Sequence, residues 1–172
     1  MLNRAGLWLD EEGCFWLAPA SAGVQSWITS AVLELKNMGF HEVVLSNFQF
    51  PNSDKYIYDK DKTEALQNAM RNLLTSTASD KGTFTLSFGT SDPTLTLPEG
   101  ARSRIYLQGI DAKDVDTAVE KTTVPDRSAQ IVFLATTNDT RFDKNSDLRP
   151  LSAAKTLEAA KAANAATEEA EQ

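Results

Sequence analysis

The segment Val43–Pro51, with the sequence VVLSNFQFP, decides the fold class of this chain. It begins with consecutive aliphatic residues, which is typical of a strand buried on both faces of a parallel sheet. The strand runs without a turn signal into polar and aromatic residues and ends at a proline. We therefore expect a buried strand whose carboxyl end carries polar side chains, at the position where parallel sheets usually place their functional residues.

Helical patterns flank this strand on both sides. Ser21 is a plausible N-cap for apolar residues that recur every three or four positions as far as Met38, and Gly39 is a natural stop. After the strand, residues 60–76 carry a second amphipathic pattern. The strand is therefore expected to lie between two helices.

Apolar strands and helices continue to alternate along the chain. Strands are indicated at 83–88, 104–110 and 130–135, and a short helix capped by Asp111 precedes the last of them. This alternation predicts an α/β fold with crossover helices and a mainly parallel sheet. The strands expected to be parallel and in chain order are Val43–Leu45, Phe84–Phe88, Ile105–Leu107 and Ile131–Leu134.

The two ends of the chain differ from this pattern. Leu7–Leu9 and Cys14–Leu17, separated by a charged turn ending in Gly13, predict an N-terminal hairpin. Residues 1–150 are interpreted as a single α/β domain. Residues 151–172 are rich in alanine and have little to bury, so we expect a helical or disordered tail.

Composition limits the classes of function. A chain of 172 residues with 41% hydrophobic residues can bury one core. Its net charge of -7 and lack of a basic cluster argue against a nucleic-acid partner. The single Cys14 and the single His41 argue against a zinc framework, and no cofactor or metal is expected. Neither a signal peptide nor a membrane span is indicated, and the localisation stays open.

The passage around the first strand resembles a family of bacterial glycoside hydrolases with a TIM-barrel domain. That family has the pattern Gly-Phe-Asp-Glu, three apolar residues, Asp, aromatic, apolar, Arg, aromatic, Pro. The positions that follow it here are Gly39, Phe40, Glu42, Val43, Val44, Leu45, Phe50 and Pro51. The preceding WLAPAS, Trp16–Ser21, resembles the family's Trp-Leu-(Asn/Asp)-Pro entry to the same helix. The resemblance implies a barrel fold and a carbohydrate substrate.

Two departures from the family pattern bear on activity. Ser46 stands where the acid is expected, and Gln49 stands where the arginine is expected, while Asn47 takes the aromatic or second acidic position. A glycosidase ordinarily needs two carboxyl groups, and neither serine nor asparagine has a pKa suited to that role. Both residue types hydrogen-bond sugar hydroxyls. The resemblance therefore implies a carbohydrate-binding or catalytically degenerate chain.

Other candidate residues follow from the barrel interpretation, because barrels place their sites at the carboxyl ends of strands. The predicted ligand-binding residues are Ser46, Asn47, Gln49, Asn138 and Arg141, with Gln108 and Asp111 at the same edge and Tyr56 and Tyr58 as stacking surfaces. Asp92 and Asp139 are the candidates for catalytic acids. Each also has a structural interpretation, since Asp92 precedes Pro93 in a turn and Asp139 lies in a polar loop.

The size of the domain raises a further expectation. A closed (β/α)₈ barrel takes about 250 residues, so residues 1–150 form a partial barrel, which the resemblance places in the carboxyl-terminal half. We expect self-association or a complementary N-terminal half to cover the open edges. Two alternatives to carbohydrate binding stay open. One is an active glycosidase with Asp92 and Asp139, or with acids in a missing N-terminal half, and the other is an α/β protein-interaction module.

Overall fold

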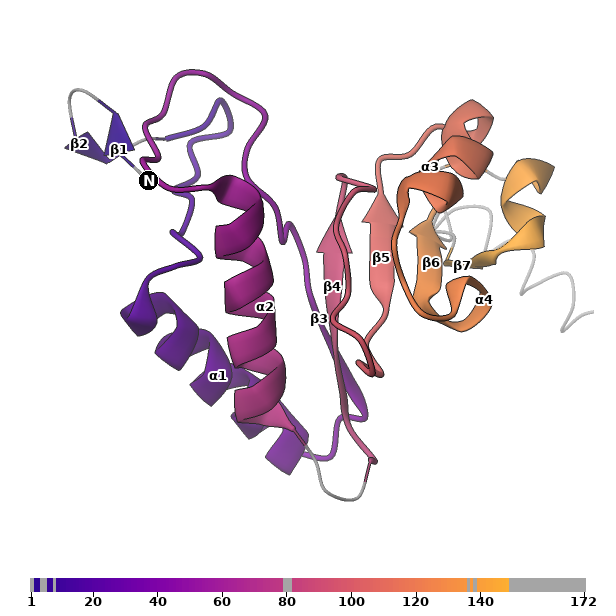
Figure 1. Ribbon diagram of the computed structural model, residues 1–172, viewed down its shortest axis with the longest axis horizontal. Helices are drawn as coiled ribbons and strands as arrows, with labels where there is room; N and C mark the ends of the chain where they lie inside the picture. The colour runs from indigo at the N-terminus through magenta and orange to yellow at the C-terminus, as the bar shows by residue number, and fades with distance from the viewer. Residues whose placement is uncertain are drawn as a thin grey trace, which may run out of the picture.

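The computed structural model describes residues 2–3, 6–7, 9–78, 82–135, 137 and 139–148. Its main element is an all-parallel sheet of five strands in chain order (Figure 1). The strands are β3 (Glu42–Leu45), β4 (Thr85–Thr90), β5 (Ile105–Gln108), β6 (Ile131–Leu134) and β7 (Ser146–Leu148). The α/β class and the parallel order of the four expected strands are confirmed. The sheet is open, and barrel closure is not seen among the described strands.

Helices and 3₁₀ turns connect the strands. They are α1 (Ala22–Asn37), α2 (Lys62–Thr77), η1 (Ala112–Asp114), α3 (Val115–Lys121), α4 (Arg127–Gln130) and η2 (Thr140–Lys144). Ser21 caps α1 as expected, because its hydroxyl accepts a hydrogen bond from the backbone N–H of Val24 at 3.4 Å. Asp61 caps α2 in the same way. Asp111 takes the N-cap position of η1, but its carboxylate accepts no capping hydrogen bond.

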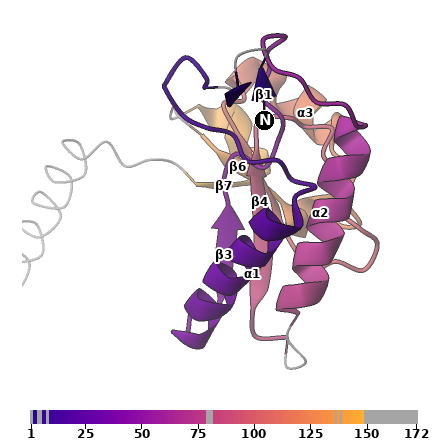
Figure 2. The same ribbon diagram turned by 90° about the vertical axis from the view of Figure 1, so that its left-hand side faces the viewer.

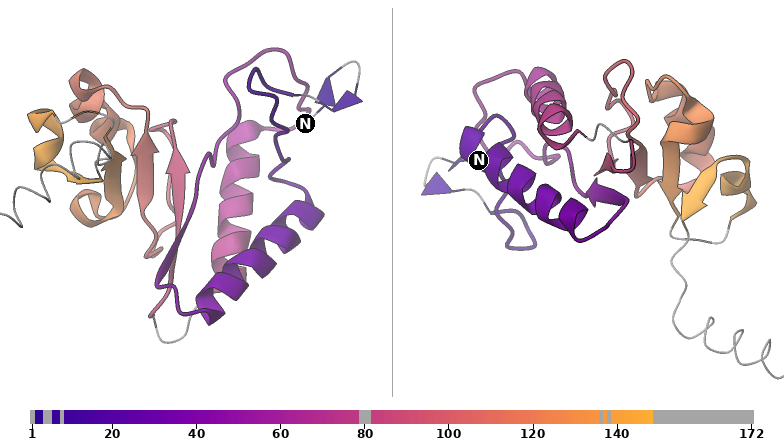
Figure 3. Two further views of the ribbon diagram at one scale, coloured as in Figure 1. Left: turned by 180° about the vertical axis from the view of Figure 1, so that it is seen from behind. Right: turned by 90° about the horizontal axis from the view of Figure 1, so that it is seen from below.

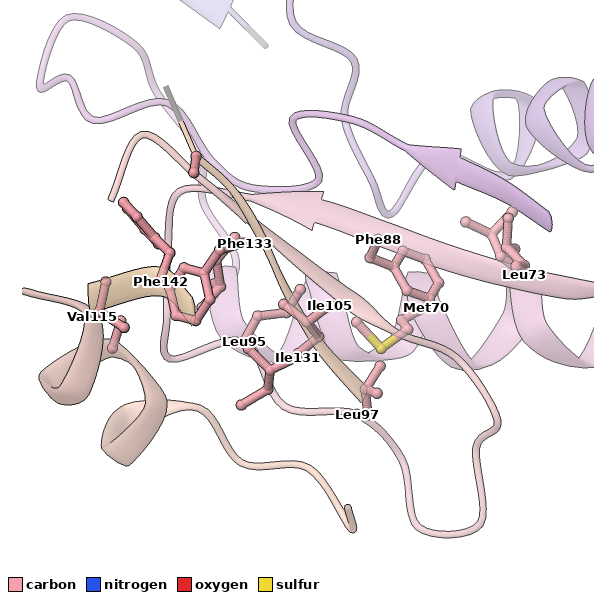
Figure 4. Packing of buried hydrophobic residues seen from close by; sticks show 14 of the residues in the cluster. Met70, Leu73, Phe88, Leu95, Leu97, Ile105, Val115, Ile131, Phe133 and Phe142 are labelled. Atoms are coloured by element: carbon pink, nitrogen blue, oxygen red, sulfur yellow. The ribbon is translucent and has the colours of Figure 1, made fainter. Parts of the chain in front are cut away.

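The hydrophobic core lies on the face of the sheet that the helices cover. Figure 4 shows Phe88 of β4 against Met70 of α2, and Phe133 of β6 against Phe142 of η2. The connection from β4 to β5 has no helix, and its buried Leu95 and Leu97 complete the core instead. Burial of these large apolar side chains is the main stabilising contribution.

The opposite face of the sheet is open. Seen from behind, β3, β4 and β5 have no helix in front of them (Figure 3). All residues of β3 are accordingly half-buried, so the expectation of a strand buried on both faces was wrong for this strand. β3 lies at the edge of the sheet, and α1 and α2 pack against each other beside it (Figure 2).

The N-terminal segment differs from the predicted hairpin. A short antiparallel pair forms between β1 (Leu2–Asn3) and β2 (Gly6–Leu7), whereas the described residues of the predicted partners form a bridge between Leu9 and Phe15. Asp10 closes the turn between these partners, because its carboxylate accepts hydrogen bonds from the N–H groups of Glu12 and Cys14. The predicted tail, residues 151–172, lies outside the described residues. None of the described helices has the length and apolar character needed to cross a membrane.

Candidate functional site

The turn after β3 exposes the polar residues that follow it. Asn47 has a φ of 55°, in the left-handed region that asparagine adopts more readily than most residues. The chain then turns so that the backbone N–H of Phe48 donates to the carbonyl of Gly89 at 2.7 Å. The ring of Phe48 packs on Phe88, with 4.7 Å between ring centroids. This anchored turn leaves Ser46 and Asn47 exposed at the carboxyl edge of the sheet.

A side-chain hydrogen bond crosses this edge from β5 to the turn. Nε2 of Gln108 donates to Oδ1 of Asn47 at 2.5 Å. The strand between them, β4, has Gly89 at this level. A Cβ at that position would lie 3.3 Å from Cα of Ser46 and 3.7 Å from Oε1 of Gln108. The absence of a side chain at Gly89 therefore allows Gln108 to reach Asn47.

Gln49 ties the same turn to the end of β4. Its Oε1 accepts hydrogen bonds from Oγ1 of Thr90 at 2.9 Å and from the N–H of Ser91 at 2.5 Å. We call Asn47, Gln49 and Gln108 the amide cluster. Within the described part of the chain, Nδ2 of Asn47, Nε2 of Gln49 and Oε1 of Gln108 have no hydrogen-bond partner. The cluster thus presents uncharged donors and an acceptor in fixed positions.

An open cleft of about 1250 Å³ adjoins the amide cluster and extends along β3 between α1 and α2. Ser46, Asn47 and Gln49 line it. The side chains of Phe15 and Trp27 also line it and are 58% and 66% exposed. The cleft therefore combines aromatic surface with amide groups.

The rim of the cleft is acidic, and its first acid has a structural role. Asp10 accepts hydrogen bonds from the N–H of Cys14 and from the indole Nε1 of Trp16, each at 2.8 Å. These bonds hold the pKa of Asp10 below its ordinary value, with the Cys14 bond as the largest cause. Glu11 forms an exposed ion pair with Lys55 at 3.3 Å. Asp10 thus holds the loop that forms the rim.

The two candidate catalytic acids are engaged locally and do not line the cleft. Oδ1 of Asp92 accepts hydrogen bonds from the N–H and the hydroxyl of Thr94, at 2.9 and 2.7 Å. Asp139 forms a two-pronged ion pair with Arg141 at 2.9 and 2.7 Å, and this bonding raises the pKa of Arg141. Both acids therefore stabilise turns, which is their structural interpretation. Asn138 lies outside the described residues.

The two predicted stacking residues pack into their own loop. Tyr56 is 7% exposed, and its hydroxyl donates to the carbonyl of Pro51 at 3.1 Å. Its ring lies 4.7 Å from Nζ of Lys62. Tyr58 packs on Phe50, with 4.7 Å between centroids, and burial raises the pKa of its phenol. Neither tyrosine lines the cleft.

Charged side chains meet at the other end of the open sheet face. Nη1 of Arg104 lies 2.6 Å from Oε2 of Glu42, and the hydroxyl of Ser87 donates to Oε1 of Glu42 at 2.6 Å. Tyr106 is buried beside them, and the pKa of its phenol is raised by burial first and then by the charge of Glu42. We call Glu42, Ser87, Arg104 and Tyr106 the ionic cluster. Its members are paired with one another.

Two aromatic residues of the cleft were missed by sequence reasoning. Trp27 lies three residues after Val24 and four before Ala31, so it follows the apolar spacing of α1, yet it is exposed. Helical spacing therefore did not mark Trp27 as exposed. Phe15 gave no signal of exposure either, because its exposure depends on the Asp10 loop.

Comparisons with known proteins add no family. No family model, curated protein or solved structure matches the chain. Among the described residues there is also no group of three or more His, Cys, Asp or Glu side chains that could hold a metal ion. Function is therefore inferred from the chemistry of the cleft and the amide cluster, because fold class does not determine function.

Proposed function

We propose that the chain binds a neutral saccharide at the amide cluster and does not hydrolyse it. The observation that carries this proposal is the set of free amide groups on Asn47, Gln49 and Gln108, held in place by their other hydrogen bonds. Sugar hydroxyls both donate and accept hydrogen bonds, and amide side chains complement both roles. Because these amides are already oriented, little conformational entropy is lost on binding.

The aromatic residues of the cleft support the same ligand class. Trp27 and Phe15 expose large apolar side chains in a concave surface, where exposed aromatic residues usually mark a binding site. The apolar face of a sugar ring packs on such side chains while its hydroxyl groups remain available to the amides. We assign the stacking role to Trp27, which is the more exposed of the two.

The chemistry of the edge favours binding over catalysis. Assisted cleavage of a glycosidic bond requires a positioned proton donor, and acid–base catalysis contributes roughly 10²- to 10⁴-fold. Ser46 and Asn47 supply no such proton. Asp92 and Asp139 are held in local turns away from the cleft lining, which supports binding without turnover.

A saccharide array followed by titration calorimetry tests the proposal. We expect Asn47→Gly, which preserves the left-handed backbone and removes the amide, to weaken binding about tenfold, since each lost hydrogen bond costs about 0.5–1.5 kcal/mol. Trp27→Ala should weaken it by a similar factor. Asn68→Ala, on α2 and outside the cleft lining, is the matched control and should have no effect.

The pH profile and a hydrolysis assay complete the test. Binding should be constant from about pH 5 to 8, because the amide cluster contains no titrating group in this range. Failure of every saccharide to bind would overturn the proposal. So would hydrolysis of a glycoside that disappears in Asp92→Asn or Asp139→Asn.

A further inference from the structure

The free edge of β3 is an unused hydrogen-bonding surface. We infer that it takes up an extended, apolar strand of a partner polypeptide that runs parallel to β3. This inference does not depend on saccharide binding. β3 is the terminal strand of the described sheet, and a terminal strand presents a row of backbone N–H and C=O groups without ladder partners.

The pairing of β3 with β4 shows which backbone groups face outward. The N–H of Thr85 donates to the carbonyl of His41 at 2.9 Å, so the backbone of His41 faces β4. Successive residues of a strand direct these groups to opposite sides, so the N–H and C=O groups of Glu42 and Val44 face the free edge. Val44 also lines the cleft. The cleft therefore lies along the unpaired backbone.

Helices line the cleft beside this edge and indicate the direction of an added strand. Residues of both α1 and α2, including Ile28 and Leu73, line the cleft beside Leu45 of β3. α1 packs against α2 and β3 and enters β3 through a short turn at Gly39. This is the position of a helix that connects two neighbouring parallel strands. No described strand occupies the other side of that connection, so the empty position suits a strand parallel to β3.

The size and charge of the cleft specify the occupant further. Its volume of about 1250 Å³ exceeds the roughly 300–1,000 Å³ of ordinary small-molecule sites. The Asp10 loop contributes Glu11 and Glu12 to the rim and the loop after β3 contributes Asp54, while Lys55 is the one cation among the described lining residues. The carboxyl end of a parallel strand would reach this rim. The occupant is therefore an apolar strand with a basic residue at its carboxyl end.

Labelled synthetic peptides test the inference by fluorescence anisotropy. The parent probe has about six Val, Ile and Thr residues followed by two lysines. Two further peptides carry N-methyl groups on alternate sets of amides, so that only one set lies against β3. We expect the peptide methylated on the amides that face β3 to lose about tenfold in affinity per blocked hydrogen bond. The affinity of the other methylated peptide should be unchanged. Equal losses, or no binding of the parent, would overturn the inference.

The charge of the rim gives a second measurement. Glu12→Gln combined with Asp54→Asn should weaken binding of the lysine-ended peptide about twofold to fivefold and leave a glutamine-ended peptide unaffected. Glu120→Gln on α3 is the matched control, because Glu120 is exposed and does not line the cleft. Sedimentation that shows a dimer dissociated by the peptide would assign the edge to a second copy and overturn the inference. Saccharide binding, measured on the same samples, separates its failure from that of the proposed function.

Discussion

At the two ends of the open sheet face, different kinds of side chains connect β3 to β5. The ionic cluster joins β3 to β5 at the amino end through a charged pair, and the amide cluster joins them at the carboxyl end through neutral groups. In both places the side chains meet across β4. The residues of β4 beneath them are small, Ser87 at one end and Gly89 at the other. Small residues on the central strand therefore allow side chains from its two sides to form direct hydrogen bonds and ion pairs with each other.

The clusters also differ in what they leave free. The ionic cluster pairs its charges internally, as buried or half-buried charges must be. The amide cluster keeps free donors on Asn47 and Gln49, which line the cleft, and a free acceptor on Gln108 beside them. We therefore assign a structural role to the first cluster and a binding role to the second.

Gly89→Val should disrupt the amide cluster. Its Cβ would lie 3.3 Å from the backbone of Ser46, and its methyl groups would occupy the path of Gln108. We expect the free energy of unfolding in urea to fall by about 1–3 kcal/mol and saccharide binding to be lost. Gly23→Ala in α1 is the control, because its Cβ meets only Oγ of Ser21 at 3.8 Å. A similar loss in both variants would contradict the role of Gly89.

Glu42→Gln should disrupt the ionic cluster. The variant removes the charge that pairs with Arg104, where the two side chains are 23% and 44% exposed. We expect a loss of about 1–2 kcal/mol in unfolding free energy. Glu11→Gln is the control, because the side chains of Glu11 and Lys55 are 91% and 67% exposed, and its effect should stay below about 0.5 kcal/mol. Equal effects would show that the ionic cluster is no stronger than a surface pair.

The smallest expected effect is on the pH dependence of the unfolding free energy, which tests the buried phenol of the ionic cluster. Burial raises the pKa of Tyr106 above its ordinary value of 10.0, so the folded state favours the neutral phenol. The stabilisation of the folded state that comes from this raised pKa is fully present below pH 10.0. It is lost as the pH rises through the folded-state pKa. The unfolding free energy should therefore fall above about pH 10, and less steeply in Tyr106→Phe. Identical slopes in the two proteins would contradict the assignment.

Much of the sheet could be predicted because burial requires apolar residues at regular spacing along strands and helices. Four strands and both long helices follow from apolar spacing and from caps such as Ser21. The short β7 was missed, because Ser146–Leu148 has one apolar residue and its pairing depends on backbone groups. The half-buried state of β3 was missed for a different reason. Local sequence does not reveal whether a neighbouring strand is present.

The candidate site was predictable only in part. Asn47 and Gln49 were expected at the carboxyl end of a strand because they directly follow it, and in the structure they line the cleft beside that end. The burial of Tyr56 was not predictable, because it depends on a bond to Pro51 within a loop that is polar overall. The cleft itself was not predictable either. Its walls come from α1, α2 and the Asp10 loop, which are brought together only by the tertiary fold.

The chain order of the strands has a consequence for synthesis on the ribosome. Each strand of the sheet pairs only with strands next to it in sequence, beginning with β3 and β4. Because folding proceeds from the N-terminus as the chain emerges, we expect β3, α2 and β4 to assemble before β6 and β7 have been translated. A partner strand would then meet a completed edge on a nascent chain whose remaining strands are still being made.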